Sequence, residues 1–84
     1  MTDLLAWRDA NPLRRWRAKN KVSLSQAAML MGVSKTTVCG WENGEYRPGW
    51  ESTYSIANAM GMREHRLRSL WMKWLAEKAA NEAA

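Results

Sequence analysis

The stretch SLSQAAMLMGVSKTTVCGWENG, residues 23–44, predicts two short helices joined by a tight turn. Ser23 and Gln26 form a capping box, a pair of side chains that satisfies two free backbone N–H groups at a helix start. Apolar residues then recur at helical spacing until Gly32, a residue type that commonly ends helices. Ser34 is an N-cap for a second helix, which an Asn-Gly turn pair ends. Two short helices around one glycine predict a helix-turn-helix.

The residues at the crossing of these two helices follow a specific spacing. A small residue, Ala28, precedes the glycine of the turn, and Val38 follows it on the second helix. That helix ends in Trp-Glu-Asn-Gly, residues 41–44, and Pro48 lies shortly after. With these residues the chain resembles the phage repressor and Cro-type helix-turn-helix family, also called the xenobiotic-response-element type. The resemblance extends in register from about residue 13 to residue 67.

The resemblance implies an all-α fold, a repressor-like DNA-binding domain of five helices. We expect an N-terminal segment over residues 1–10, the helix-turn-helix domain over 11–67 and an extended C-terminal helix over 68–84. In the family an arginine of the first helix pairs with the glutamate of the Trp-Glu-Asn-Gly run. The resemblance therefore implies a structural ion pair between Arg17 and Glu42.

Helices are also expected on both sides of the motif. Thr2-Asp3 is a candidate cap for a short helical turn, and Asn11-Pro12 starts a helix that runs to about Asn20. Another helix follows the loop, from Trp50 to Met60. Its core-facing side is expected to carry Trp50, Thr53, Tyr54, Ala57 and Met60.

The charge of the chain favours a polyanionic partner. The 84 residues include 13 Lys and Arg against 8 Asp and Glu, which gives a formal net charge of +5. Basic domains are attracted to the phosphates of nucleic acid. Many basic domains bind no nucleic acid, however. The charge therefore supports nucleic-acid binding only together with the helix-turn-helix motif.

Catalysis, metal binding and membrane insertion find no support in the sequence. One Cys and one His provide neither a nucleophile–base pair nor a set of metal ligands, so we expect no enzyme activity, no metal and no cofactor. No apolar run approaches the roughly 20 residues that span a bilayer, and the N-terminus lacks a signal-peptide pattern. A single Cys fits a reducing cytoplasm, and we expect a cytoplasmic protein of prokaryotic or phage origin.

The second helix of the motif is the expected recognition helix, whose N-terminal residues meet base edges in the major groove. The resemblance places base-reading positions at Lys35, Thr36 and Gly40, with Thr37 alongside. Lysine can donate to guanine, and threonine can hydrogen-bond a base or contact the thymine methyl group. Glycine has no side chain to read with, so Gly40 is expected to allow a close backbone approach or a bridging water.

Two groups of residues are expected to contact DNA phosphates on either side of the recognition helix. Ser23 and Ser25 lie at a helix start, where free N–H groups attract anions. Asn43, Tyr46 and Arg47 belong to the loop that follows the recognition helix. Contacts of this kind fix the register of a protein on the duplex but carry no sequence information.

The C-terminal helix carries more large apolar residues than so small a core needs. Two arrangements are open. These apolar residues mediate homodimerisation, or the helix that carries them packs against Leu4 and Trp7 of the same chain. The expected dimerisation residues are Leu70, Trp71, Trp74 and Leu75.

Met29 and Leu30 lie on the side of the first motif helix that faces away from the motif's own core. Either the segment from Leu4 to Trp7 covers them, or they form an exposed apolar patch for a second protein partner.

Two functions follow from the sequence. The first is a sequence-specific regulator that binds double-stranded DNA, as a dimeric repressor on a palindromic operator. The alternative is a protein-interaction module, such as an antitoxin, built on the same fold.

Overall fold

The computed structural model describes residues 4–83, and these residues form helices but no strand. The all-α fold predicted from the sequence is confirmed. One helix more than expected is present, because the N-terminal segment forms a helix instead of a turn; its expected cap, Thr2-Asp3, lies outside the described residues. The helices are α1 (Leu4–Asp9), α2 (Pro12–Asn20), α3 (Leu24–Met31), α4 (Lys35–Asn43), α5 (Trp50–Met60) and α6 (Glu64–Ala83).

Side-chain caps fix the boundaries of the helix-turn-helix. The Ser23 hydroxyl accepts a hydrogen bond from the Gln26 N–H at 3.1 Å, and the Gln26 side chain accepts one from the Ser23 N–H at 2.8 Å. Both bonds of the predicted capping box are therefore present. At the start of α4, the Ser34 hydroxyl accepts from the Thr37 N–H at 3.1 Å. These caps satisfy backbone donors that the first turn of each helix leaves free.

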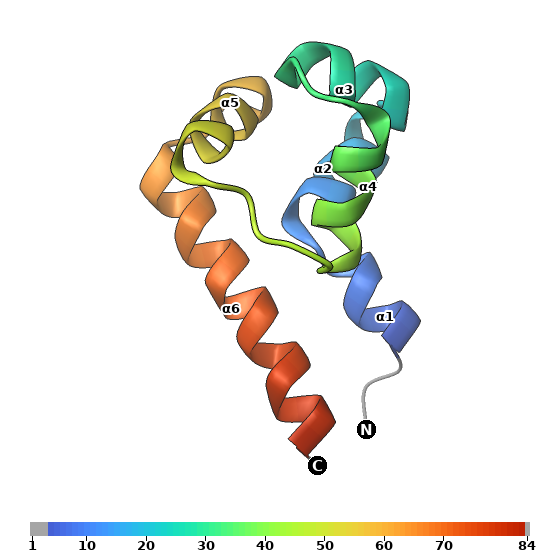
Figure 1. The fold of residues 1–84 in the computed structure, drawn as a ribbon, viewed down its shortest axis with the longest axis vertical. Coiled ribbons are helices and arrows are strands. Elements are labelled where there is room, and N and C mark those ends of the chain that lie inside the picture. The colour runs from blue at the N-terminus through green and yellow to red at the C-terminus, as the bar shows by residue number, and fades with distance from the viewer. Residues whose placement is uncertain (1–3, 84) are drawn as a thin grey trace.

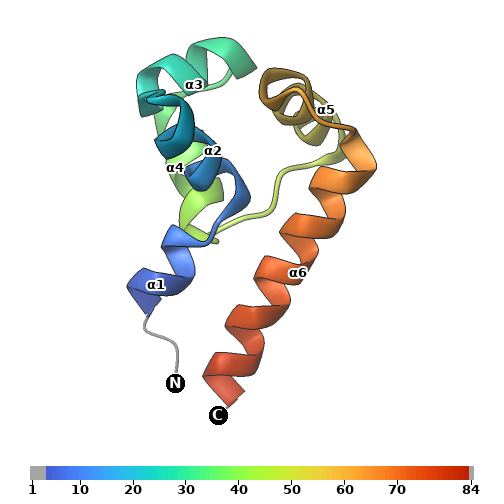
Figure 2. The same ribbon diagram turned by 180° about the vertical axis from the view of Figure 1, so that it is seen from behind.

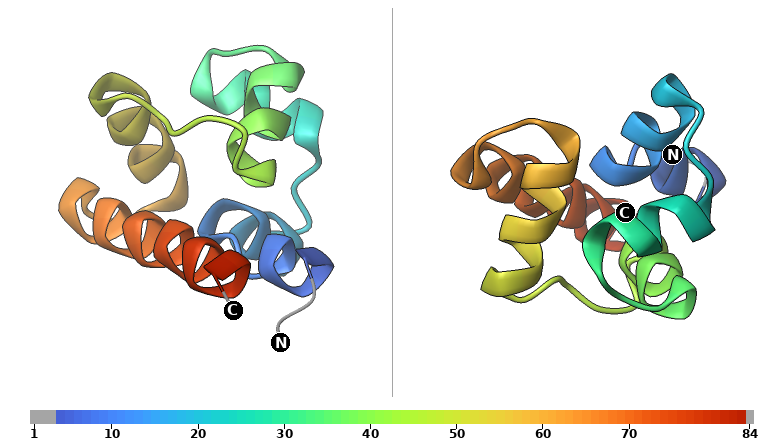
Figure 3. Two further views of the ribbon diagram at one scale, coloured as in Figure 1. Left: turned by 60° about the horizontal axis from the view of Figure 1, so that its bottom comes forward. Right: turned by 90° about the horizontal axis from the view of Figure 1, so that it is seen from above.

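The helices form a bundle with one long member along its side. Helices α2 to α5 lie together toward one end, and α6 runs from beside α5 to the other end (Figure 1). The view from behind shows α2 in front of α4, with α6 to one side (Figure 2). Helix α1 lies beside the C-terminal part of α6, so the first and last helices meet (Figure 3).

The core sits where α2, α4, α5 and α6 converge. Each of these helices contributes one fully buried aliphatic side chain: Leu13, Val38, Ile56 and Leu67. Helix α3 contributes the small buried residues Ala27 and Ala28. Small side chains let helix axes approach closely, which explains how α3 packs against α4 across the short turn.

Two tryptophans join α1 to α6. The rings of Trp7 and Trp74 are stacked, with centroids 4.0 Å apart and planes 5° from parallel. Each indole N–H donates to the backbone carbonyl of the other residue, at 2.7 Å from Trp7 and 2.6 Å from Trp74. Gly44 completes the contact, since its φ is +73° and a Cβ there would lie 2.5 Å from the Trp7 ring. Helix α1 thus contributes Trp7 to the core.

This arrangement corrects the expected role of two dimerisation residues. Trp71 and Trp74 are both buried within their own chain, so neither is an exposed contact for a second copy. The fold-back onto Trp7 is the arrangement that the structure adopts. Leu70 and Leu75, on the same helix, remain partly exposed.

The core-facing side of α5 also differs from the expectation. Thr53, Ile56 and Ala57 are buried, whereas Trp50 and Tyr54 are exposed. The side of α5 that packs on the core is the one that carries Thr53, Ile56 and Ala57. Trp50 and Tyr54 lie beside this buried side and face solvent. Their rings pack edge to face on the surface, with centroids 6.3 Å apart.

Candidate nucleic-acid interface

Helix α4 presents one side to the core and the other to solvent. Val38 and Trp41 are buried against the neighbouring helices, and they fix the rotation of α4 about its axis. The exposed side carries Lys35, Thr36 and Cys39. A short helix with an exposed polar side and firm support behind it has the shape required to enter a DNA major groove.

An ion pair attaches the C-terminal end of α4 to α2. Arg17 Nε donates to Glu42 Oε2 at 2.6 Å, and Nη2 donates to Oε1 at 2.7 Å. Both side chains are largely buried, and Arg17 Nη1 also donates to the Val22 carbonyl at 3.2 Å. The hydrogen bond to Glu42 raises the pKa of Arg17 above its usual value. The paired groups hold α4 in a single orientation relative to α2.

The residues expected to read bases fall into distinct environments. Lys35 and Thr36 are exposed in the first turn of α4, with side chains free to reach outward. Thr37 is half-buried, and its hydroxyl lies 2.8 Å from the Ser34 hydroxyl. Because Thr37 belongs to the capping hydrogen bonds, it is less available to a base than its two neighbours.

Gly40 lies on the outward side of α4, one turn after Thr36, yet it is buried. The ring of Tyr46 covers it, so closely that a Cβ at position 40 would lie 2.3 Å from Tyr46 Cζ. The expectation that the Gly40 backbone is open to a bound partner is therefore wrong. Tyr46 reaches this position from the loop after α4, which no helical periodicity of the sequence could indicate. A glycine inside a helix, close before a loop tyrosine, is the one sequence signal for it.

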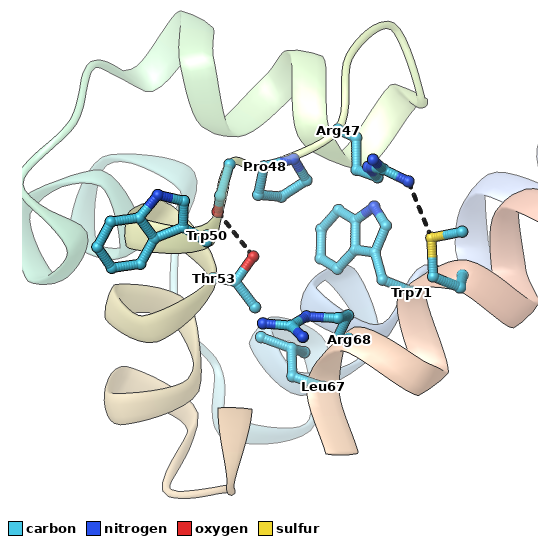
Figure 4. Close-up of a pocket in the computed structure, with 9 residues that line it drawn as sticks. Arg47, Pro48, Trp50, Thr53, Leu67, Arg68 and Trp71 are labelled. Atoms are coloured by element: carbon cyan, nitrogen blue, oxygen red, sulfur yellow. Dashed lines mark hydrogen bonds between the residues drawn. The ribbon is translucent and has the colours of Figure 1, made fainter. Parts of the chain in front are cut away.

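Some of the residues expected to contact phosphates are exposed, and others are engaged in hydrogen bonds within the protein. Ser25 is exposed, whereas the Ser23 hydroxyl is engaged in the cap of α3. Asn43 is half-buried and donates through its amide to Cys39 Sγ at 3.3 Å. Arg47 is exposed and extends from the loop toward α6, where it donates to Met72 Sδ at 3.1 Å (Figure 4). A thioether is a weak acceptor, so this guanidinium can exchange it for a phosphate.

A family model described as a helix-turn-helix domain matches residues 10–70 of the chain. The chain belongs to the helix-turn-helix domain family. This membership indicates a DNA-binding regulator, in agreement with the exposed side of α4. Neither the curated proteins nor the solved structures give a significant match to this helix-turn-helix protein.

Met29 and Leu30 form an exposed apolar patch on α3 of this helix-turn-helix domain. Their exposed fractions are 83% and 62%. Of the two alternatives, coverage by the segment from Leu4 to Trp7 is ruled out, because Trp7 anchors that segment to α6. Helix α1 and helix α3 lie at opposite ends of the molecule (Figure 1).

A second apolar surface surrounds a cavity of about 370 Å³ beside the loop of the helix-turn-helix domain (Figure 4). Pro48, Leu67, Trp71 and the polar Thr53 line it and are buried, and the exposed Arg47 and Arg68 lie at its edge. Trp50 and Met72 line it from the exposed side, and Trp50 is 67% exposed. An indole exposed to this extent next to an apolar cavity is typical of a surface that contacts another macromolecule.

No helix within residues 4–83 is long and apolar enough to cross a membrane. In the same part of the chain, no group of three or more His, Cys, Asp or Glu side chains is arranged to hold a metal ion.

Proposed function

We propose that this protein is a transcriptional regulator of the phage repressor and Cro type, which binds a palindromic operator as a dimeric repressor. The observation that carries the proposal is the outward side of α4, which Val38, Trp41 and the Arg17–Glu42 pair support from behind. In this proposal α4 enters the major groove with its N-terminal turn leading. Lys35 and Thr36 then reach base edges, while Thr37 stabilises the start of the helix.

Phosphate contacts flank α4 in the proposed complex. Arg47 gives up its contact with Met72 and binds the backbone beyond the C-terminal end of α4. Ser25 and the start of α3 bind the backbone on the other side, where helical N–H groups favour anions. Affinity from these contacts is electrostatic and falls steeply with salt concentration.

A dimer is needed because one helix reads too few base pairs. Each correct base pair contributes about 1–3 kcal/mol, which does not select a single site in a genome. A two-fold dimer reads a second half-site about 34 Å away on the same face of the duplex. Since Trp71 and Trp74 are buried in their own chain, we place the second copy on exposed Trp50 and Met72 instead. A protruding indole next to an apolar cavity suits a self-complementary contact.

Selection of preferred duplexes from a random pool tests this function. The expected result is a palindrome with half-sites one helical turn apart. Lys35→Ala should then relax the preference at one base pair per half-site, because it removes a donor to a base. Arg47→Ala should weaken binding to all sequences alike, because it removes only a phosphate contact. Equal effects of the two substitutions would contradict these roles.

The alternative function, a protein-interaction module such as an antitoxin, is supported by the exposure of Met29 and Leu30. Titration of the protein on random-sequence duplex DNA at two salt concentrations separates the two functions. The regulator binds such DNA weakly, and its affinity decreases strongly as salt rises. Absence of any such binding would leave only the interaction module.

A further inference from the structure

We propose that Tyr46 supplies the base-reading side chain that Gly40 lacks. A residue of the loop then completes the outward surface of α4, and Tyr46 determines specificity instead of only contacting a phosphate. This inference rests on the proposed DNA-binding function and adds a specificity residue to it.

The position of the ring is the first argument. Thr36 and Gly40 are one turn apart on α4, so they share its outward side. Tyr46 lies on this side, with its Cζ, Oη and Cε1 atoms 2.3, 2.4 and 2.7 Å from where a Cβ of residue 40 would stand. The ring therefore occupies the space that a side chain at position 40 would take. It remains 46% exposed, so part of it is accessible to a partner that approaches this side of α4.

The hydroxyl of Tyr46 is oriented by α4 itself. It donates to the carbonyl oxygen of Thr36 at 3.3 Å. This bond is longer than the usual O–H···O distance, so it directs the ring without enclosing the hydroxyl. While the proton faces Thr36, the oxygen retains lone pairs that can accept a hydrogen bond. In the major groove the base donors are the amino groups of adenine and cytosine, so Tyr46 is expected to read one of these.

The glycine at position 40 shows that Tyr46 and α4 fit each other closely. Alanine at position 40 would favour the helix, since glycine is among the least favourable residues in a helix interior. The methyl group of an alanine at position 40 would also occupy the space that the Tyr46 ring now fills. Glycine is required only if the tyrosine ring itself must lie against α4. The two residues therefore act as a pair.

Two substitutions test the pair from opposite sides. Tyr46→Phe removes only the hydroxyl, and Gly40→Ala displaces the ring while leaving Tyr46 intact. Both variants should lose preference at the same base pair of each half-site in duplex selection, by about 5-fold or more, the size of one direct base contact. Lys35→Ala is the matched control and should lose preference at a different base pair. Gly40→Ala should not lower the melting temperature, which separates its effect from unfolding.

An operator that lacks the amino group of the base at that position gives the second readout. Wild-type protein should bind it about 5-fold or more weakly than the intact operator, whereas Tyr46→Phe should bind both operators equally. The inference is overturned if Tyr46→Phe keeps the wild-type preferences, or if it weakens binding to all sequences alike as a phosphate contact would. A wild-type protein without any sequence preference would instead overturn the proposed function, so the two failures are distinguishable.

Discussion

At the scale of single residues, the Arg17–Glu42 pair makes the clearest prediction about stability. Arg17→Met leaves the Glu42 carboxylate buried without a countercharge, and we expect a loss of about 3 kcal/mol. Glu42→Gln should cost less, because Arg17 is the more exposed partner and keeps its bond to the Val22 carbonyl. A domain of 84 residues has only about 4–13 kcal/mol of total stability, so urea denaturation resolves both losses. Losses below about 1 kcal/mol for both variants would show that the pair does not anchor α4.

Residue roles were predictable from the sequence where they depend on local hydrogen bonds. Ser23 with Gln26, and Ser34, cap their helices as predicted, because the partners of a cap lie within three residues in the sequence. The position of Tyr46 against Gly40 was not predictable. It depends on the path of an irregular loop, which neither periodicity nor capping rules determine.

At the scale of secondary-structure elements, α1 depends strongly on one buried tryptophan. A helix of six residues is too short to be stable alone, so its order comes from tertiary contacts, of which the stacked and hydrogen-bonded contact of Trp7 with Trp74 is the most buried. Trp7→Ala should cost about 3–5 kcal/mol, as large truncations in a core do. Trp7→Phe keeps an aromatic ring but loses the N–H donor, and should cost about 1 kcal/mol or more. Trp50→Phe, at an exposed indole, is the control for thermal denaturation and should have little effect.

The dependence of α1 on a distant contact explains why the sequence predicted the bounds of some helices but not of α1. The bounds of α2, α3 and α5 agree with the predictions, because proline, glycine and capping residues mark their ends. Helix α1 lacks such marks within the described residues, and the tryptophan that orders it has its partner 67 positions later in the chain. The buried side of α5 differs from the predicted one for a related reason. Amphipathic spacing indicates that a helix has a buried side, but the neighbouring helices decide its exact centre, which here favours Ile56 over Tyr54.

At the scale of the whole molecule, the proposed dimer leads to a prediction about the surface that joins its two copies. The surface around Trp50 and Met72 combines exposed apolar side chains with Arg47 and Arg68, and tryptophan contributes strongly to interfaces when a partner covers it. Trp50→Glu should therefore convert a dimer into a monomer in sedimentation analysis. Leu70→Glu introduces the same charge on another side of α6. The cavity there is lined in part by the charged residues Arg15, Lys19, Arg66, Lys73 and Glu77, and its indole, Trp74, is buried, so this variant should leave the dimer intact.

DNA binding connects the dimer surface to function. A dimer binds both half-sites of an operator as one unit, so the second contact benefits from a high effective concentration. Trp50→Glu should lower affinity for a complete operator by about 100-fold or more, the lower range of such avidity effects. Its affinity for a single half-site should stay the same, because α4 and its supporting pair are unchanged. Equal losses on the operator and on the half-site would mean that Trp50 contacts DNA, and a Trp50→Glu protein that still sediments as a dimer would place the second copy elsewhere.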